Sequence, residues 1–212
     1  MYSVFQKLIG LACIALVVVA CNQDDKPQIG EDNLFFVGFE VENDTIYFED
    51  GVNNYGNGPG IDTYEDSVGR LHSQFTTFIR SALDSNYTSN ILTVQMVKFL
   101  TDTLFPSYNT SYLLFDEGTY NYGSWNEDST SAGIDGAVIT YTDSNEKTWS
   151  SNQLYGNQEN WASFEITSHK PVEGLQFGAK TKGNFNCRVF DGLGEHLDLR
   201  NGQFHARTIY QQ

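Results

Sequence analysis

From residue 34 onward, apolar and polar residues alternate with a period of two, the pattern of strands that bury one face. The first such segment places on one face Phe35, Val37, Phe39 and Val41. After a turn at Asn43-Asp44, a second segment carries Ile46 and Phe48. The same alternation predicts strands over residues 91–97, 137–142, 147–150, 163–168, 184–190, 196–200 and 203–209.

Turn-forming residues separate these segments. Residues 143–146 predict a hairpin loop, and a closing meander has its turns at Gly192, Gly194 and Asn201-Gly202. Residues 51–60 are rich in Gly and Asn and include Pro59, which predicts a loop.

Residues 66–83 fit two structures. Apolar residues recur there at the three- and four-residue steps of a helix face: Val68, Leu71, Phe75, Phe78, Ile79 and Ala82. Gly69 and two threonines disfavour a helix, so a strand is slightly preferred and both stay open. We predict an all-β fold, an antiparallel β-sandwich or flattened barrel of about nine or ten strands, with one short helix around 66–83 as the alternative.

The N-terminal region has a different pattern. Lys7 precedes an apolar run over residues 8–20, which ends in Ala20 directly before Cys21. This order is typical of a secretory signal, and the run is shorter than the about 20 residues that span a bilayer. The predicted organisation is a signal peptide over 1–20, a flexible acidic tether over 21–33 and a β-sandwich domain over 34–212.

The residues around Cys21 resemble two known signals. Val-Val-Ala before Cys21 resembles the lipobox of bacterial lipoproteins, which implies that Cys21 becomes the first mature residue and carries diacylglycerol and palmitate. Asp24-Asp25 resembles the export signal of Bacteroidota lipoproteins, although acids also suit a plain polar tether. The resemblance implies a lipid anchor in the outer membrane, with the protein on the cell surface.

The chain has 27 acidic and 12 basic residues, a net charge of −15 at pH 7. This charge disfavours nucleic acid and anionic lipid head groups as partners, because both bind basic surfaces. Solubility explains the charge, and a divalent-cation site is the alternative. Of the three cysteines, only Cys187 lies beyond the predicted anchor, so no internal disulfide is expected. Its place in an alternating segment predicts a small buried residue.

Several C-terminal segments together resemble a known group of proteins. They are residues 136–143, 163–168, 182–187 and 199–204, with residues 39–48 nearer the start. In this order they resemble the small uncharacterised β-sandwich lipoproteins of gut and marine Bacteroidota. The resemblance covers about half of the chain and implies fold and location, with no catalytic residues to carry over.

No segment matches a nucleophile elbow, a phosphate-binding glycine loop or a zinc-binding helix. His196 and His205 are expected to face each other across the final hairpin, as a surface pair or alternatively as metal ligands. Calcium has weak candidate ligands in Asp50, Asn53, Asn54 and Asp62, but the EF-hand pattern is absent and loop composition explains them better. We therefore predict no enzyme activity and no cofactor.

Two groups of aromatic residues stand among polar ones, where flat rings with a polar edge suit sugars and wet interfaces. The candidate ligand-binding rings are Tyr120, Tyr122, Trp125, Trp149 and Trp161. Ordinary packing in the sandwich is the alternative. The expected function is a non-catalytic surface module that binds glycan or another extracellular ligand. The alternative function is an accessory subunit that docks on another outer-membrane protein.

Aspartate followed by Ser or Thr and then an apolar residue or Thr resembles the O-glycosylation signal of exported Bacteroidota proteins. The matching positions are Thr45, Ser67, Thr103 and Ser129. Turns also favour Asp-Ser and Asp-Thr pairs, so turn formation is the alternative.

Overall fold

The computed structural model of this protein describes residues 35–52, 55–65, 71–81, 91–99, 116–124, 133–171 and 179–208. The chain divides into two compact units, residues 1–31 and 32–212, and the described residues all belong to the second. Cys21 and the predicted signal and tether over 1–33 lie outside them. The regular secondary structure of the described part is entirely β, so the predicted fold class is confirmed.

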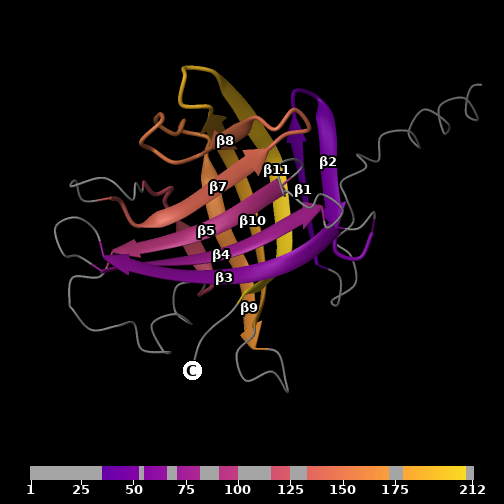
Figure 1. The fold of residues 1–212 in the computed structure, drawn as a ribbon, viewed down its shortest axis with the longest axis vertical. Coiled ribbons are helices and arrows are strands. Elements are labelled where there is room, and N and C mark those ends of the chain that lie inside the picture. The colour runs from indigo at the N-terminus through magenta and orange to yellow at the C-terminus, as the bar shows by residue number, and fades with distance from the viewer. Residues whose placement is uncertain are drawn as a thin grey trace, which may run out of the picture. The chain divides into compact units, whose positions relative to one another are not determined.

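Eleven strands are present (Figure 1). They are β1 (Phe36–Val41), β2 (Asp44–Glu49), β3 (Tyr55–Glu65), β4 (Leu71–Ser81), β5 (Ile91–Phe99), β6 (Gly118–Tyr120), β7 (Gly136–Thr142), β8 (Thr148–Ser150), β9 (Ser163–Pro171), β10 (Ala179–Phe190) and β11 (His196–Thr208).

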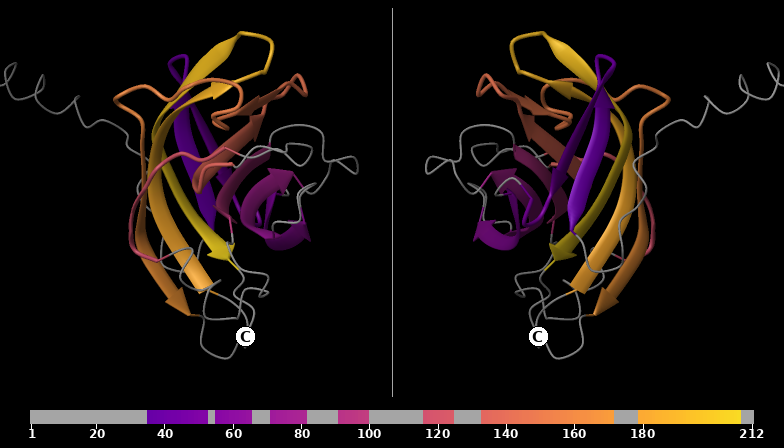
Figure 2. Two further views of the ribbon diagram at one scale, coloured as in Figure 1. Left: turned by 90° about the vertical axis from the view of Figure 1, so that its left-hand side faces the viewer. Right: turned by 90° about the vertical axis from the view of Figure 1, so that its right-hand side faces the viewer.

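All strand pairs are antiparallel, and the hydrogen-bonded order is β2-β1-β11-β10-β8-β7-β5-β4-β3, with β9 and β6 branching from β10. β10 pairs with β9 along its first part but with β8 only through Phe190 and Ser150. Because a single residue pair joins β8 to β10, the sheet bends sharply there and folds into two halves. The strands β9, β10, β11 and β1 then face β7, β5, β4 and β3 across the core (Figure 2).

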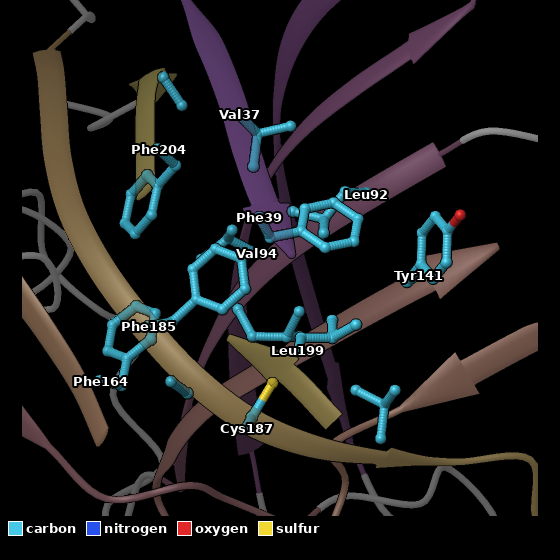
Figure 3. Close-up of a cluster of buried hydrophobic side chains, with 14 of the residues drawn as sticks. Val37, Phe39, Leu92, Val94, Tyr141, Phe164, Phe185, Cys187, Leu199 and Phe204 are labelled. Atoms are coloured by element: carbon cyan, nitrogen blue, oxygen red, sulfur yellow. The ribbon is translucent and has the colours of Figure 1, made fainter. Parts of the chain in front are cut away.

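The core lies between these two halves. Phe39 of β1 and Tyr141 of β7 are not neighbours in the sheet, yet their ring centroids are 5.1 Å apart. Phe185 and Cys187 point from β10 into the same cluster and are fully buried (Figure 3). Burial of apolar surface from both halves is the main force that holds the sandwich closed.

Cys187 is a free cysteine with no exposed surface, which confirms the prediction of a small buried residue. Burial raises the pKa of its thiol well above the usual range. Because a thiol reacts as the thiolate, we expect a maleimide to label Cys187 in protein starting at residue 22 only as fast as the protein unfolds. Mass spectrometry over time, with a urea-unfolded control, measures this rate. Complete labelling within minutes in the folded state would contradict the buried position.

The ambiguous segment around 66–83 forms a strand where it is described. β4 pairs with β3 on one edge and with β5 on the other, so the helix alternative is wrong for Leu71–Ser81. Pairing with a strand on each edge outweighs the helical spacing of the apolar residues. The threonine, isoleucine and phenylalanine residues of this segment also favour a strand.

The loop predicted over 51–60 is wrong from Tyr55 onward, because β3 is a strand that pairs with β4 from Tyr55 to Glu65. β3 ends the strand order. Pro59 lacks a backbone N–H, and an edge strand tolerates this because one of its sides makes no ladder.

The turn predicted at Asn201-Gly202 is also wrong, because β11 continues without a break to Thr208. Leu199 pairs with Cys187 and Gly202 pairs with Phe185, so β11 has one residue more than β10 in this stretch. Asn201 has a φ of 50°. The Asn-Gly pair therefore forms a β-bulge, which changes the direction of neighbouring side chains. His196 and His205 consequently lie on the same strand and do not face each other, contrary to the prediction.

The three other predicted turns are present, and the one at Gly192 and Gly194, with φ values of 76° and 111°, joins β10 to β11. Glu42 and Asn43 have φ values of 52° and 82°, as a two-residue hairpin turn requires, so this turn begins one residue before the predicted Asn43-Asp44. Between β7 and β8, Asp143 Oδ1 accepts hydrogen bonds from the backbone N–H groups of Asn145 and Lys147 at 2.8 and 3.0 Å.

Candidate functional site

The five predicted ligand-binding aromatics do not form one surface. Trp125 lies outside the described residues. Tyr122 and Trp149 are core residues, and Tyr120 is half-buried at the edge of the core. Of the four rings that the structure describes, Trp161 is the one on the outer side of the sheet. The structure therefore separates rings that the sequence placed in two groups.

Tyr122 is 4% exposed and packs against Phe164. Its hydroxyl donates to the backbone carbonyl oxygens of Ser163 and Asn186, each at 3.0 Å, and burial raises the pKa of this hydroxyl. Both the ring and its polar edge are thus occupied within the protein. The prediction that Tyr122 contacts a ligand is wrong.

Trp149 is 6% exposed on β8 and belongs to the core cluster. Its indole N–H donates to Asp143 Oδ2 at 3.2 Å, and Lys147 Nζ lies 4.2 Å from the ring centroid. Lys147 also pairs with Asp191 at 2.9 Å and with Glu195. The prediction of a ligand-facing ring is wrong here too, because the partners of this indole all come from the protein.

Tyr120 donates from its hydroxyl to the backbone oxygen of Asp116 at 2.7 Å and packs its ring on Phe164. Burial raises the pKa of this hydroxyl, and the charge of Asp116 adds to the effect. Its role toward a ligand stays a prediction.

Trp161 is half-buried immediately before β9, on the face of the sheet that turns away from the core. Arg200 of β11 stacks on it, with the guanidinium carbon 3.1 Å from the ring centroid. β10 lies between β9 and β11, so the indole reaches across the outer face of β10. The pair forms a flat aromatic and guanidinium surface, which we call the Trp161 platform.

A row of charges fixes the platform. Asp198 accepts hydrogen bonds from Arg188 Nε at 2.8 Å and from Arg200 Nη2 at 3.1 Å, and Arg188 also pairs with Glu159. Burial acts to raise the pKa of Asp198, but the bonds from the two arginines outweigh it and the pKa is lowered. The hydrogen bond to Asp198 raises the pKa of Arg188. Both shifts favour the charged forms of Asp198 and Arg188.

Gln158 attaches the loop before β9 to the sheet. Its side-chain oxygen accepts from the Arg188 backbone N–H at 2.9 Å, and its amide nitrogen donates to the Arg188 carbonyl at 2.7 Å. The side-chain amide of Gln158 thus takes the place of the backbone N–H and C=O of a neighbouring strand and attaches the loop that carries Trp161 to β10. This positions the indole before any ligand arrives, which reduces the ordering cost of binding.

Next to the platform, a second network crosses four strands. Asn186 donates to Ser163 Oγ at 3.1 Å and accepts from the Asn201 N–H at 2.9 Å, and Asn201 donates to Glu40 at 2.9 Å. The bulge in β11 lets Arg200 and Asn201 both reach partners on this face. Beside the platform, the outer face of β9, β10, β11 and β1 is therefore ordered by hydrogen bonds between polar side chains.

Arg188, Asp198 and Arg200 were not among the residues predicted from the sequence. Each is followed or preceded by a buried residue of β10 or β11. The alternation of apolar and polar residues therefore already predicts that these three side chains point away from the core. Their mutual contacts depend on the register of the β10–β11 hairpin and on the bulge.

The other predicted sites are only partly described. Thr45 is exposed on β2 opposite Glu40, and its O-glycosylation stays a prediction. Three further predicted acceptors lie outside the described residues: Ser67, Thr103 and Ser129. Asp50 follows β2, whereas Asn53, Asn54 and the side chain of Asp62 are not described, so calcium binding there stays a prediction. Within the described ranges, no three His, Cys, Asp or Glu side chains gather closely enough to hold a metal ion.

Comparisons with protein-family models, with curated proteins and with solved structures found no match to this chain. In the part of the chain that the structure describes, no helix has the length and apolar character needed to cross a membrane.

Proposed function

We propose that the β-sandwich is a non-catalytic binding module that captures glycan or another extracellular ligand through the Trp161 platform. The observation that carries the proposal is the stacked pair of Trp161 and Arg200, fixed by Asp198 and Arg188 on a face outside the core. Rigid aromatic and arginine side chains with polar neighbours are the groups that most often dominate binding energy. In this proposal, Cys21 anchors the module by lipid to the outer membrane, on the cell surface.

Trp161→Ala should abolish or strongly weaken ligand binding while leaving the fold intact. Truncation of a central aromatic contact typically costs more than about 1.4 kcal/mol, or about tenfold in affinity. The lipidated protein in detergent would be screened against a polysaccharide panel by retardation in native gels, with and without calcium, and hits measured by calorimetry.

Tyr155→Ala is the matched control. Tyr155 lies in the same loop and is 55% exposed, and its ring is beside Gly192 in the turn between β10 and β11. Its truncation should leave the affinity for a glycan unchanged. A ligand that binds Trp161→Ala and the unmodified protein equally well would remove the platform from the proposal.

A second candidate function is an accessory subunit that docks on another outer-membrane protein. The observation that favours it is apolar exposure on two adjacent loops. Leu193 is 90% exposed and Tyr155 55%, and Gly192 lies against the Tyr155 ring. Exposed apolar residues that gather on one surface often mark protein contacts. A stable complex that is lost in Leu193→Ser but kept in Trp161→Ala would favour this function.

A further inference from the structure

The outward side chains of β10 form a stripe of cations and amides. Alternate residues of this strand are buried, and the residues between them face away from the core: Lys180, Lys182, Asn184, Asn186 and Arg188. Lys180 and Arg188 are eight residues apart, so the stripe is about 26 Å long at about 3.3 Å per residue. Near Arg188 it reaches the Trp161 platform, where the guanidinium of Arg200 lies on the indole. A ligand along β10 therefore meets no acid on the strand itself.

Positive charge gathers where β10 begins. Lys180 pairs in register with Lys170 of β9 on one side and with Arg207 of β11 on the other. Neighbouring strands are about 4.8 Å apart, so these three cations stand on a line about 10 Å long. Lys182 follows on the same face of β10. We call Lys170, Lys180, Lys182 and Arg207 the basic cluster.

The basic cluster is unfavourable for the free protein. Like charges placed directly opposite each other on neighbouring strands repel, and Lys180 has such a neighbour on both sides. Four of the 12 lysines and arginines of the chain stand here, although the chain has 27 acids. A ligand with several anionic groups would offset this repulsion.

Acids border the cluster on the side of β9. Glu165 is exposed on β9, and Asp116 and Glu117 stand just before β6, which pairs with β9. Glu49 lies in the row of Lys182 but three strands away, on β2. At the other end of the stripe, the arginines of the platform already have carboxylate partners. On the described part of this face, excess positive charge is therefore confined to the cluster.

We infer that the ligand of the module is an acidic glycan with about one charge for each sugar ring, a uronic-acid polymer, and that it lies along the outer face of β10. This inference rests on the proposed function. Its carboxylates pair with the basic cluster, and its hydroxyls contact the amides of Asn184 and Asn186. At the platform the polymer meets the guanidinium of Arg200, which the Trp161 ring supports from below.

The arrangement of charges favours this class over other anions. A single small anion gains little, because one exposed ion pair contributes little, whereas a polymer pairs with several cations at once and releases its counterions. Interactions between exposed charges fade beyond about 8 Å at physiological ionic strength, so the net charge of the chain does not prevent this pairing. A densely charged polymer, such as a nucleic acid or a heavily sulfated glycan, would place further charges over the acids beside β9.

Lys180→Gln tests the cluster at its centre. We expect it to weaken binding of an oligouronate by about two- to fivefold, the range of one exposed charge interaction. It should leave the urea midpoint of the free protein unchanged or raised, because it removes a like-charge neighbour, whereas loss of a merely structural lysine would lower this midpoint. Lys147→Gln is the matched control. It removes one positive charge at the opposite end of β10, where Lys147 pairs with Asp191, and should leave the affinity unchanged.

The binding test uses the lipidated protein in detergent and matched sets of oligosaccharides, measured by calorimetry. For β-glucan, β-mannan and α-glucan, each backbone is supplied unmodified, oxidised at C6 to the uronic acid, and heavily sulfated, beside a single-stranded oligonucleotide. We expect at least one oxidised form to bind about tenfold or more tightly than its neutral parent and than the two densely charged polymers. Its affinity should fall as salt rises, and Trp161→Ala should weaken it.

The outcomes that overturn the inference can be told apart. If a neutral parent binds as tightly as its oxidised form and Trp161→Ala loses it, the ligand class is wrong while the proposed function stands. Tighter binding of the sulfated form or the oligonucleotide also makes the class wrong. If Lys180→Gln and Lys147→Gln weaken the oligouronate equally, the basic cluster is not its site. If no member of any set binds, the proposed glycan capture fails and the inference falls with it.

Discussion

Replacing Gly136 with alanine should lower the free energy of unfolding by more than about 3 kcal/mol, a large share of the about 5–15 kcal/mol that a folded protein has. Gly136 begins β7 with a φ of 150°. A Cβ at this position would lie 2.3 Å from the backbone oxygen of Asn121 and 2.9 Å from the backbone nitrogen of Gly123. Both atoms are held by hydrogen bonds, since Asn121 O accepts from the Ala137 N–H and the Gly123 N–H donates to Ala137 O, each at 2.9 Å. The clash therefore cannot be relieved without breaking this backbone contact.

Gly118→Ala is the control for the backbone conformation alone. Gly118 has a φ of 156°, but a Cβ there would meet no atom within 4 Å. Its replacement should cost about 1 kcal/mol, the conformational term by itself. Urea unfolding followed by tryptophan fluorescence gives both values, and equal stability of the two variants would show that the close approach at Gly136 carries no energetic weight.

Most strands of the sandwich could be predicted from the sequence because they follow one physical rule. A strand that buries one face alternates, and β10 shows this along its length, with Phe185, Cys187 and Val189 inward and Arg188 outward. The hairpin between β7 and β8 was readable for a similar reason, since Asp143 supplies the local hydrogen bonds of its own turn.

The misassigned segments were those where glycine, asparagine or proline has two uses. In β3, Pro59 and its neighbouring glycines were read as a loop, yet pairing with β4 holds them in an edge strand. Asn201-Gly202 fits a two-residue turn equally well as a bulge, and Gly202 is needed because the ring of Phe185 fills the space of a Cβ. Local composition cannot distinguish a loop from an edge strand, or a turn from a bulge, because the choice depends on pairing with another strand.

The candidate site depended on the same non-local information. Trp149 and Trp161 both stand among polar residues in the sequence, and nothing in their immediate neighbours separates a core indole from a surface one. What separates them is the strand that each adjoins. β8 directs Trp149 between the two halves of the sheet, whereas the loop held by Gln158 lays Trp161 across β10. Arg200 could be recognised as its partner only once the register and the bulge of β11 were known.

Replacing Trp149 with alanine should lower the free energy of unfolding by about 3–5 kcal/mol, the range for removing a buried aromatic side chain. The indole is 6% exposed within the core cluster and donates to Asp143, so its removal leaves both a cavity and an acceptor without its partner. Trp149→Phe keeps most of the apolar volume and loses the hydrogen bond, for which we expect a smaller cost of about 1–2 kcal/mol.

Trp161→Ala is the matched comparison, because it deletes the same side chain from the outer face. It should cost only about 1 kcal/mol, since the main loss is an exposed stacking contact with Arg200. Ligand binding should show the opposite order of the two positions: Trp161→Ala loses affinity, whereas Trp149→Phe, which keeps the fold, retains it. Urea unfolding and calorimetry on the same preparations test both orders. Equal stability of Trp149→Ala and Trp161→Ala would contradict the core position of Trp149. It would also remove the reason for placing the ligand on Trp161 and not on Trp149.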